Sequence, residues 1–273
     1  MKRLADIDDL PRLRAGDDLR LGPGEVHIWH YGLEPDPPPQ LLEAFRRLLS
    51  LEELERYARL QVPSLRQQFL ATRALCRWVL SRYEPIRPTE WRFQTDPRGK
   101  PSVSAPSASA PIFFSLSHAS GVIACAVSRA SDLIGVDIER IDRKLECIDI
   151  AEHFFPESEA RSLRRLTPER RREAFFARWA LKESFVKARG IDLAAGLAGA
   201  VFRLDDPCRV KVSFVAPLDE QDAGWRFDLR RLNEQRILAL AIRMDAGTRL
   251  RLRAAPVVFD PASSGEGLTI GRM

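Results

Sequence analysis

Two carboxylates stand two residues apart in the segment GVDIERI at 135–141. Because the side chains of a strand alternate between its two faces, Asp137 and Glu139 are expected to share one face. Two like charges on one face repel each other unless a cation or a basic group lies between them. A metal ion between Asp137 and Glu139 would offset this repulsion. A solvated edge strand whose acids pair with Arg140 or Arg143 explains the same pattern, so both interpretations stay open on these residues alone.

A second set of charged residues lies on FARWALKESFVKARG at 176–190, which has the pattern of a helix. Successive helical residues rotate by about 100°, so Trp179, Glu183 and Lys187 share a face, with Lys182 beside them. Lysine is rare in this chain, since only six of its 43 basic residues are lysines. A routine ion pair between Glu183 and Lys187 on a solvated helix is the simpler explanation, although the many apolar residues of the segment favour a mostly buried helix.

Together the two segments supply three hard oxygen donors, Asp137, Glu139 and Glu183, with lysines nearby. Proteins hold Mg²⁺ through a few carboxylates, water and substrate phosphates, and lysines complement phosphate charge. The combination favours phosphoryl transfer, in which a metal and cations neutralise charge on phosphate oxygens while the protein positions the reactants. A metal-dependent phosphohydrolase or nuclease would use the same carboxylates to activate water, so the residues leave that reaction class open.

Two shorter segments have residues suited to phosphate. FSLSHASG at 114–121 places two serines and His118 at the end of a predicted strand, without the GxSxG turn expected of a hydrolase serine. PRGKP at 97–101 puts Lys100 on a tight turn, a shape that can present N–H groups to anions. A turn serine with a hydrogen-bonded histidine, and a plain β-turn, are the simpler explanations.

These segments must be positioned by a mixed architecture, because strand patterns are followed by helix patterns and then by further strands, twice along the chain. The two strongest helices align at an offset of 106, which also places IWHYGLE (28–34) on IGVDIER (134–140). We therefore predict an α+β fold of two related halves with a site between them, although chance agreement between two Ala- and Leu-rich helices would give the same alignment. The expected organisation is a lead-in at 1–24, halves at 25–129 and 130–250, and a disordered tail at 251–273.

The composition is that of a protein with a substantial core, since 45% of its 273 residues are hydrophobic. No apolar run of about 18 residues and no signal peptide is visible, so we expect a cytoplasmic protein without membrane contact. Four scattered cysteines without a CxxC pair argue against a disulfide framework or zinc site. The net charge of +5 raises nucleic-acid binding as a non-enzymatic alternative, but the arginines are interleaved with acids and no recognition motif is present.

At these segments the sequence resembles the Sfp-type 4′-phosphopantetheinyl transferase family. The resemblance rests on RGKP (98–101), FSLSHASG (114–121), GVDIERI (135–141) and FARWALKESFVKARG (176–190), in that order. The last two are specific together, because the family pattern is GVDxE followed roughly forty residues later by WxxKExxxK. The chain has Ser115 where many relatives have asparagine.

The resemblance implies a pseudo-dimer of two similar α/β halves with coenzyme A bound in the cleft between them. The enzyme would move the 4′-phosphopantetheine arm of coenzyme A to a serine hydroxyl of an apo acyl or peptidyl carrier protein, releasing adenosine 3′,5′-bisphosphate. It further implies that Asp137, Glu139 and Glu183 hold Mg²⁺, that Glu183 helps to deprotonate the serine, and that Lys187 contacts the transferred phosphate. The implied contacts to coenzyme A are Arg56, Arg73, Arg98, Gly99, Lys100, Ser115, Ser117, His118, Lys182 and Lys187.

Such an enzyme, a holo-[acyl-carrier-protein] synthase, would serve fatty-acid, polyketide or nonribosomal-peptide biosynthesis. The sequence does not select among these carriers. Because the chain already contains both halves, we expect a monomer, and an intact set of acidic residues argues against a pseudoenzyme.

Overall fold

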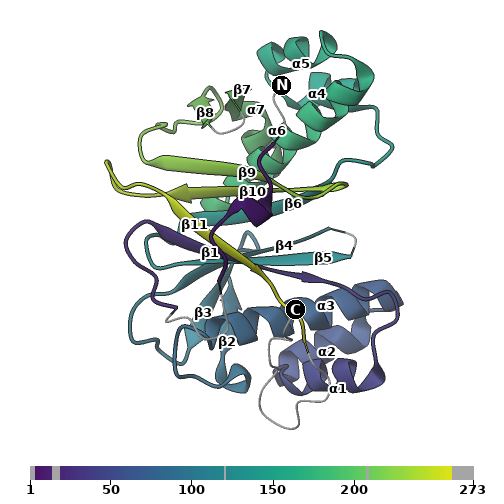
Figure 1. Ribbon diagram of the computed structural model, residues 1–273, viewed down its shortest axis with the longest axis vertical. Coiled ribbons are helices and arrows are strands. Elements are labelled where there is room, and N and C mark those ends of the chain that lie inside the picture. The colour runs from purple at the N-terminus through teal and green to yellow at the C-terminus, as the bar shows by residue number, and fades with distance from the viewer. Residues whose placement is uncertain (1–3, 14–18, 120, 207–208, 260–273) are drawn as a thin grey trace.

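The computed structural model describes residues 4–13, 19–119, 121–206 and 209–259, and it has the mixed helix and sheet composition predicted from the sequence (Figure 1). The first half of the chain contains η1 Ile7–Asp9, β1 Glu25–Gly32, α1 Pro39–Arg47, α2 Leu51–Arg59, α3 Pro63–Leu80, η2 Pro88–Glu90, β2 Arg92–Thr95, β3 Pro101–Ala105, β4 Phe113–Ala119 and β5 Val122–Ser128. The second half contains β6 Ile134–Arg140, α4 Cys147–Phe154, α5 Glu157–Arg164, α6 Pro168–Arg189, α7 Leu193–Gly199, β7 Ala200–Asp206, β8 Arg209–Phe214, β9 Trp225–Asn233, β10 Arg236–Arg243 and β11 Arg251–Pro256.

The long helix α6 starts and stops where its sequence provides the signals. Pro168 occupies the first turn, where its missing N–H costs no hydrogen bond. Gly190 ends the helix with φ 61° and ψ 48°, a left-handed conformation that a glycine adopts without steric cost. The helix therefore has fixed ends, and the positions of its side chains relative to β6 are well defined.

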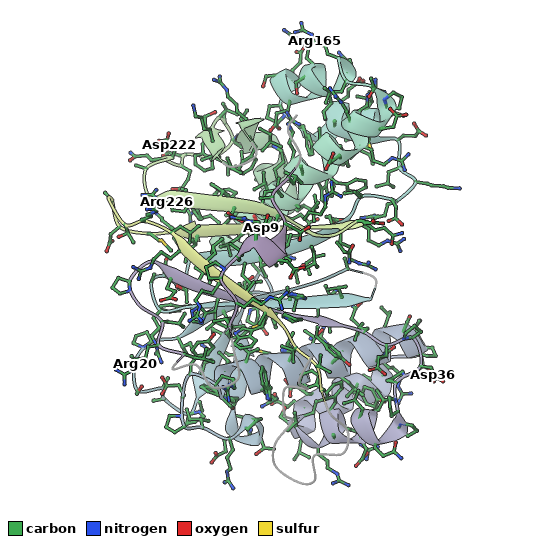
Figure 2. The ribbon with its side chains drawn as sticks, in the orientation of Figure 1. Asp9, Arg20, Asp36, Arg165, Asp222 and Arg226 are labelled. Carbon is green, nitrogen blue, oxygen red and sulfur yellow. The ribbon has the colours of Figure 1, made fainter. Side chains whose placement is uncertain are left out.

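Two sheets stack face to face between two layers of helices (Figure 1). Their strand orders are β11-β1-β5-β4 and β6-β10-β9. The inner faces bury a shared apolar core that includes Val26 and Ile28 of β1, Val136 of β6 and Leu240 of β10. Helices α1 and α3 pack on the outer face of the first sheet and α6 on that of the second. Exposed charged side chains such as Asp36 and Arg165 lie on the two outer layers (Figure 2).

The two halves repeat one order of elements: a strand, helices, a two-stranded hairpin and two further strands. In the first half β5 pairs antiparallel with both β1 and β4, and in the second half β10 pairs antiparallel with both β6 and β9. The sequence offset of 106 superimposes β1 on β6 and α3 on α6. An α+β architecture is thus confirmed, and the two small hairpins β2–β3 and β7–β8 occupy matching places in the chain.

The described parts of the two terminal segments, 4–13, 19–24 and 251–259, are more ordered than predicted. The lead-in was expected to be loosely structured, but Leu4 packs in the core around α6, Ile7 and Leu10 pack between the sheets, and Leu13 packs in the core around α3. The tail was expected to be disordered from residue 251. That prediction is wrong for 251–259, because β11 pairs in parallel with β1, and Val257 and Phe259 are buried. The rest of the predicted tail, 260–273, lies outside the described residues.

Candidate active site

Helix α6 lies directly on strand β6, and Gly135 is the residue that permits the contact. A Cβ atom on Gly135 would lie 2.0 Å from the carbonyl oxygen of Ser184 and 2.5 Å from the amide nitrogen of Ala188. No side chain fits in that space, so the helix backbone rests on the strand. Sequence reasoning did not single out this glycine for packing, although a glycine inside an apolar strand is a signal of close backbone approach.

The charged residues predicted on the two elements meet across this contact. Lys187 Nζ lies 2.6 Å from Asp137 Oδ1, and Trp179 Nε1 donates to Glu183 Oε1 at 2.8 Å. The predicted shared face of Trp179, Glu183 and Lys187 is therefore present, and it is turned toward β6. Glu139 accepts a hydrogen bond from Arg143 at 3.1 Å. Pairing of an acid with Arg143, the alternative to a metal site that the sequence left open, is therefore also present.

Burial and mutual repulsion raise the pKa values of all three carboxyl groups. Burial raises the pKa of Asp137 to about 6, against the opposing effect of the Lys187 ammonium. Burial also raises the pKa of Glu183, and the charge of Asp137 adds to that rise. The pKa of Glu139 is raised by burial and by the charge of Glu183. The pKa of each acid is thus raised in part by the negative charge of another acid of the set, and these charges are concentrated between α6 and β6.

The donor chemistry of this acidic set fits a divalent cation. Asp137 Oδ2 is buried and has no hydrogen-bond partner among the described residues. A buried carboxylate oxygen without a partner is costly, and a hard cation would satisfy it. The side chains themselves are turned to Lys187, Arg143 and Trp179, and no group of three or more His, Cys, Asp or Glu in the described ranges is arranged to hold a metal ion.

The two serines of β4 join the first sheet to the second. Ser115 Oγ accepts from the amide of Val136 at 3.0 Å, and Ser117 Oγ accepts from that of Ile138 at 3.1 Å. Ser117 also donates to Asp137 Oδ1 at 3.0 Å and accepts from Lys187. Both hydroxyls are buried and serve the junction of β4 with β6, a use that the sequence did not predict. His118, the next residue, is exposed at the end of β4.

The turn between β2 and β3 lies at the C-terminal end of α6. Arg98, Gly99 and Lys100 line a cavity of about 200 Å³ together with Ser115 and Lys187. Five of the residues implied to contact coenzyme A therefore surround one cavity, drawn from both halves of the chain. The Arg98 and Lys100 side chains are, however, engaged with main-chain carbonyls of the second half.

The other two arginines implied by the resemblance lie in a separate cavity. Arg56 and Arg73 line a space of about 620 Å³ in the first half, where Arg92 and Glu53 also take part. Glu53 pairs with Arg73 at 3.5 Å, so one of the positive charges is partly compensated.

The predicted contact of Lys182 with coenzyme A is wrong. Lys182 was expected to flank the acidic face and contact coenzyme A, but it is fully buried in the core of the second half. Its ammonium pairs with Glu159 Oε2 at 2.8 Å and donates to the carbonyl oxygen of Leu197 at 2.8 Å and to that of Ala200. A lysine with these partners joins α5, α6 and α7 and cannot reach the acidic set.

Comparison with known proteins identifies the family whose model matches the part of the chain that contains this site. Residues 133–241 match the model of the 4′-phosphopantetheinyl transferase superfamily, a range that includes Asp137, Glu139, Glu183 and Lys187. No helix within the described residues has both the length and the apolarity that crossing a membrane requires.

Similar proteins span most of the chain. The 4′-phosphopantetheinyl transferase HetI of Nostoc sp. is 33% identical over 177 residues, which cover 65% of this chain and 73% of HetI. The 4′-phosphopantetheinyl transferase Sfp of Bacillus subtilis is 30% identical over 185 residues, 67% of this chain and 79% of Sfp. An L-aminoadipate-semialdehyde dehydrogenase-phosphopantetheinyl transferase of Xenopus laevis is 27% identical over 209 residues, 72% of this chain and 68% of that protein. Sequence, family model and relatives agree that this chain is an enzyme of the Sfp-type 4′-phosphopantetheinyl transferase family.

Proposed function

We propose that this enzyme transfers the 4′-phosphopantetheine arm of coenzyme A to a serine hydroxyl of an apo acyl or peptidyl carrier protein. The observation that carries the proposal is the pairing of Lys187 with Asp137 at the contact of α6 with β6. Glu183 lies in α6 one helical turn before Lys187. An ammonium group among three carboxylates suits a site in which a phosphate and a cation meet.

The reaction exchanges one phosphorus–oxygen bond for another. The serine Oγ of the carrier attacks the phosphorus that bears the pantetheine arm, and the bond from that phosphorus to the 5′-phosphate oxygen of the nucleotide breaks. The serine proton goes to Glu183, directly or through water, and adenosine 3′,5′-bisphosphate leaves with the bond electrons. Burial raises the pKa of Glu183, which makes its carboxylate a stronger proton acceptor than an exposed glutamate.

Lys187 would stabilise charge on the phosphate oxygens during this exchange. Its ammonium is a compact point charge that is one-third exposed, so it can reach a bound phosphate while remaining beside Asp137. Asp137, Glu139 and Glu183 would hold Mg²⁺, whose chemistry is to neutralise the pyrophosphate charge. The unpartnered Asp137 Oδ2 supports this assignment.

The nucleotide part of coenzyme A would lie across the junction of the two halves, which we interpret as a pseudo-dimer with its active site in the cleft. The matching strand orders of the two halves support that interpretation. The cavity bounded by Arg98, Gly99 and Lys100 and the arginine-lined cavity at Arg56 and Arg73 are the candidate sites for the nucleotide. Ser117 accepts a hydrogen bond from Lys187, which lines the first of these cavities, and His118 is the next residue of β4. One chain supplies both halves, so we expect the monomer to be active.

The experiment is incubation of the protein with coenzyme A, Mg²⁺ and a panel of apo carriers from fatty-acid, polyketide and nonribosomal-peptide systems. We expect intact mass to rise by about 340 Da on at least one carrier, the mass of the arm. EDTA should stop the reaction and excess Mg²⁺ should restore it. Coenzyme A cleaved while no carrier gains mass would overturn the proposal in favour of a phosphohydrolase.

A further inference from the structure

The N-terminal segment 4–13 reaches the core of each half and the core between them. Its large apolar residues recur at every third position, as Leu4, Ile7, Leu10 and Leu13, and all four are buried. Leu4 packs in the core of the second half, and Leu13 packs in that of the first. Ile7 and Leu10 pack between the two sheets. Figure 1 shows this segment, in dark purple, crossing from the second sheet to the first, and we call it the N-terminal strap.

The strap also pairs with one edge of each sheet. The carbonyl oxygen of Ala5 accepts from the amide of Arg231 in β9 at 2.9 Å. The carbonyl oxygen of Pro11 accepts from the amide of Ala254 in β11 at 3.2 Å, and the amide of Leu13 donates to the Ala254 carbonyl oxygen at 3.1 Å. β9 and β11 are the last strands of their sheets. The strap therefore provides hydrogen-bond partners to main-chain groups at both of these edges.

These edges lie on the side of the sheets opposite to the acidic set. In the strand orders β11-β1-β5-β4 and β6-β10-β9, β4 and β6 are the edges that meet through Ser115 and Ser117, beside Asp137. The two sheets are thus connected along both sides, by serine hydroxyls on one side and by the strap on the other. Two layers connected along both sides have a fixed separation, whereas layers connected along one side can open about it as a hinge.

The strap has a defined shape. Its middle is the short 3₁₀ helix η1, in which Asp6 Oδ1 accepts from the amide of Asp8 at 3.3 Å. In return, the amide of Asp6 donates to Asp9 Oδ2 at 2.9 Å. Reciprocal capping of this kind fixes a turn. Asp8 and Asp9 are exposed, whereas Ile7 and Leu10 on either side of them are buried, so the turn directs both apolar side chains into the space between the sheets.

We propose that the strap is a conformational device that sets the separation of the two halves. While the strap is docked, the junction of β4 with β6 stays closed, and when the strap is released, this junction loosens. The contacts of Ser117 in the first half with Asp137 and Lys187 in the second span the junction, so they depend on the strap. The consequence for coenzyme A rests on the proposed function, which places the nucleotide across the same junction.

The variant that tests the proposal is Ile7→Ala/Leu10→Ala in the full-length protein. It removes the apolar anchors that the strap places between the sheets. The matched control is Leu163→Ala/Leu197→Ala, the same kind of truncation at two buried leucines in the core of the second half. A general loss of stability is common to both variants, so a difference between them reports the strap.

Amide hydrogen exchange of the ligand-free protein is the first measurement. Arg231 and Ala254 report docking, because the strap accepts their amide hydrogens. Val136 and Ile138 report the junction, because their amides donate to the serine hydroxyls of β4. In Ile7→Ala/Leu10→Ala we expect exchange at both pairs to rise roughly tenfold or more relative to the amides of β10, which lies inside the second sheet. In the control, exchange at both pairs relative to β10 should stay within about twofold of the wild type.

Addition of coenzyme A with Mg²⁺ is the second measurement. A ligand that binds across the closed junction lowers the population of the open state, so saturating coenzyme A should return exchange at Val136 and Ile138 toward the wild-type rate. If coenzyme A leaves these amides unchanged while the ligand-free difference between the variants is present, the proposed placement of coenzyme A fails and the role of the strap stands.

Two results would overturn the role of the strap. One is exchange that rises at Arg231 and Ala254 but not at Val136 and Ile138, because the strap would then cover two edges without holding the halves. The other is an equal rise in the control. If Ile7→Ala/Leu10→Ala does not fold, Asp6→Ala removes the cap of η1 at a half-buried position and is judged by the same amides.

Discussion

Lys187 and Asp137 form the closest charge contact of the candidate site, with 2.6 Å between Nζ and Oδ1. Ser117 Oγ lies within hydrogen-bond distance of both groups, at 3.0 Å from each. One ammonium on α6 therefore joins β6 of the second half to β4 of the first. The contact also leaves the other oxygen of Asp137 without a partner in the described part of the chain, and this is where we expect the cation.

Glu183→Gln should reduce transfer by about 10²–10⁴-fold, because the amide cannot accept the serine proton and is a weaker metal ligand. The fold should persist, since glutamine can still accept the hydrogen bond from Trp179. Intact-mass rates with a responsive carrier and a circular dichroism melt measure the two effects. Glu169→Gln, at an exposed glutamate in the first turn of α6, is the control. Wild-type turnover in Glu183→Gln would remove this residue from the mechanism.

Lys187→Met should lower turnover more than coenzyme A affinity, because the ammonium acts on the phosphate during transfer. The substitution also leaves buried Asp137 without its cation, so the metal-free protein should lose about 1–3 kcal/mol of unfolding free energy. Urea unfolding measures the stability change, and Mg²⁺ should recover part of it by binding the freed carboxylate. A loss of affinity without a loss of turnover would contradict the assigned role.

Gly135→Ala should displace α6 from β6 and lower both stability and activity. The added methyl would lie 2.0 Å from a backbone oxygen, which cannot move without shifting the helix, and we expect at least about 2 kcal/mol of destabilisation. Gly32→Ala is a matched control, because nothing lies within 4 Å of a Cβ at that strand position. Equal thermal stability of the two variants would show that the helix does not depend on this contact.

His30 should make the protein less stable in mild acid. Burial lowers its pKa from 6.5 to about 4, against the opposing effect of Asp8. Above pH 6.5 the imidazole is neutral in both states. Between pH 6.5 and 4 the unfolded chain takes up a proton that the folded protein does not, so stability falls with pH, by up to about 3 kcal/mol. Urea unfolding at pH 7.5 and pH 5 should show a smaller difference for His30→Gln than for the wild type. His153→Gln, at an exposed histidine of α4, should leave the difference unchanged.

The periods of strand and helix predicted which acidic side chains share a face, because that information is local. The same helical period already indicates that Lys182 points away from the acidic face, because a residue five positions before Lys187 lies about 140° away from it around the helix. What the sequence could not supply was the partner of that lysine, Glu159, which reaches it from another helix. The use of Ser115 and Ser117 by amides of β6 was likewise hidden, because it depends on how two sheet edges meet.

The parallel pairing of β11 with β1 limits how far the two halves can be treated as separate units. If the gene were divided between residues 129 and 130, the first polypeptide would lack the edge strand of its own sheet and the second would carry that strand unpaired. Each product would expose backbone hydrogen-bonding groups that invite aggregation. Although the halves look alike, we expect them to require one continuous polypeptide, or co-expression, to become soluble.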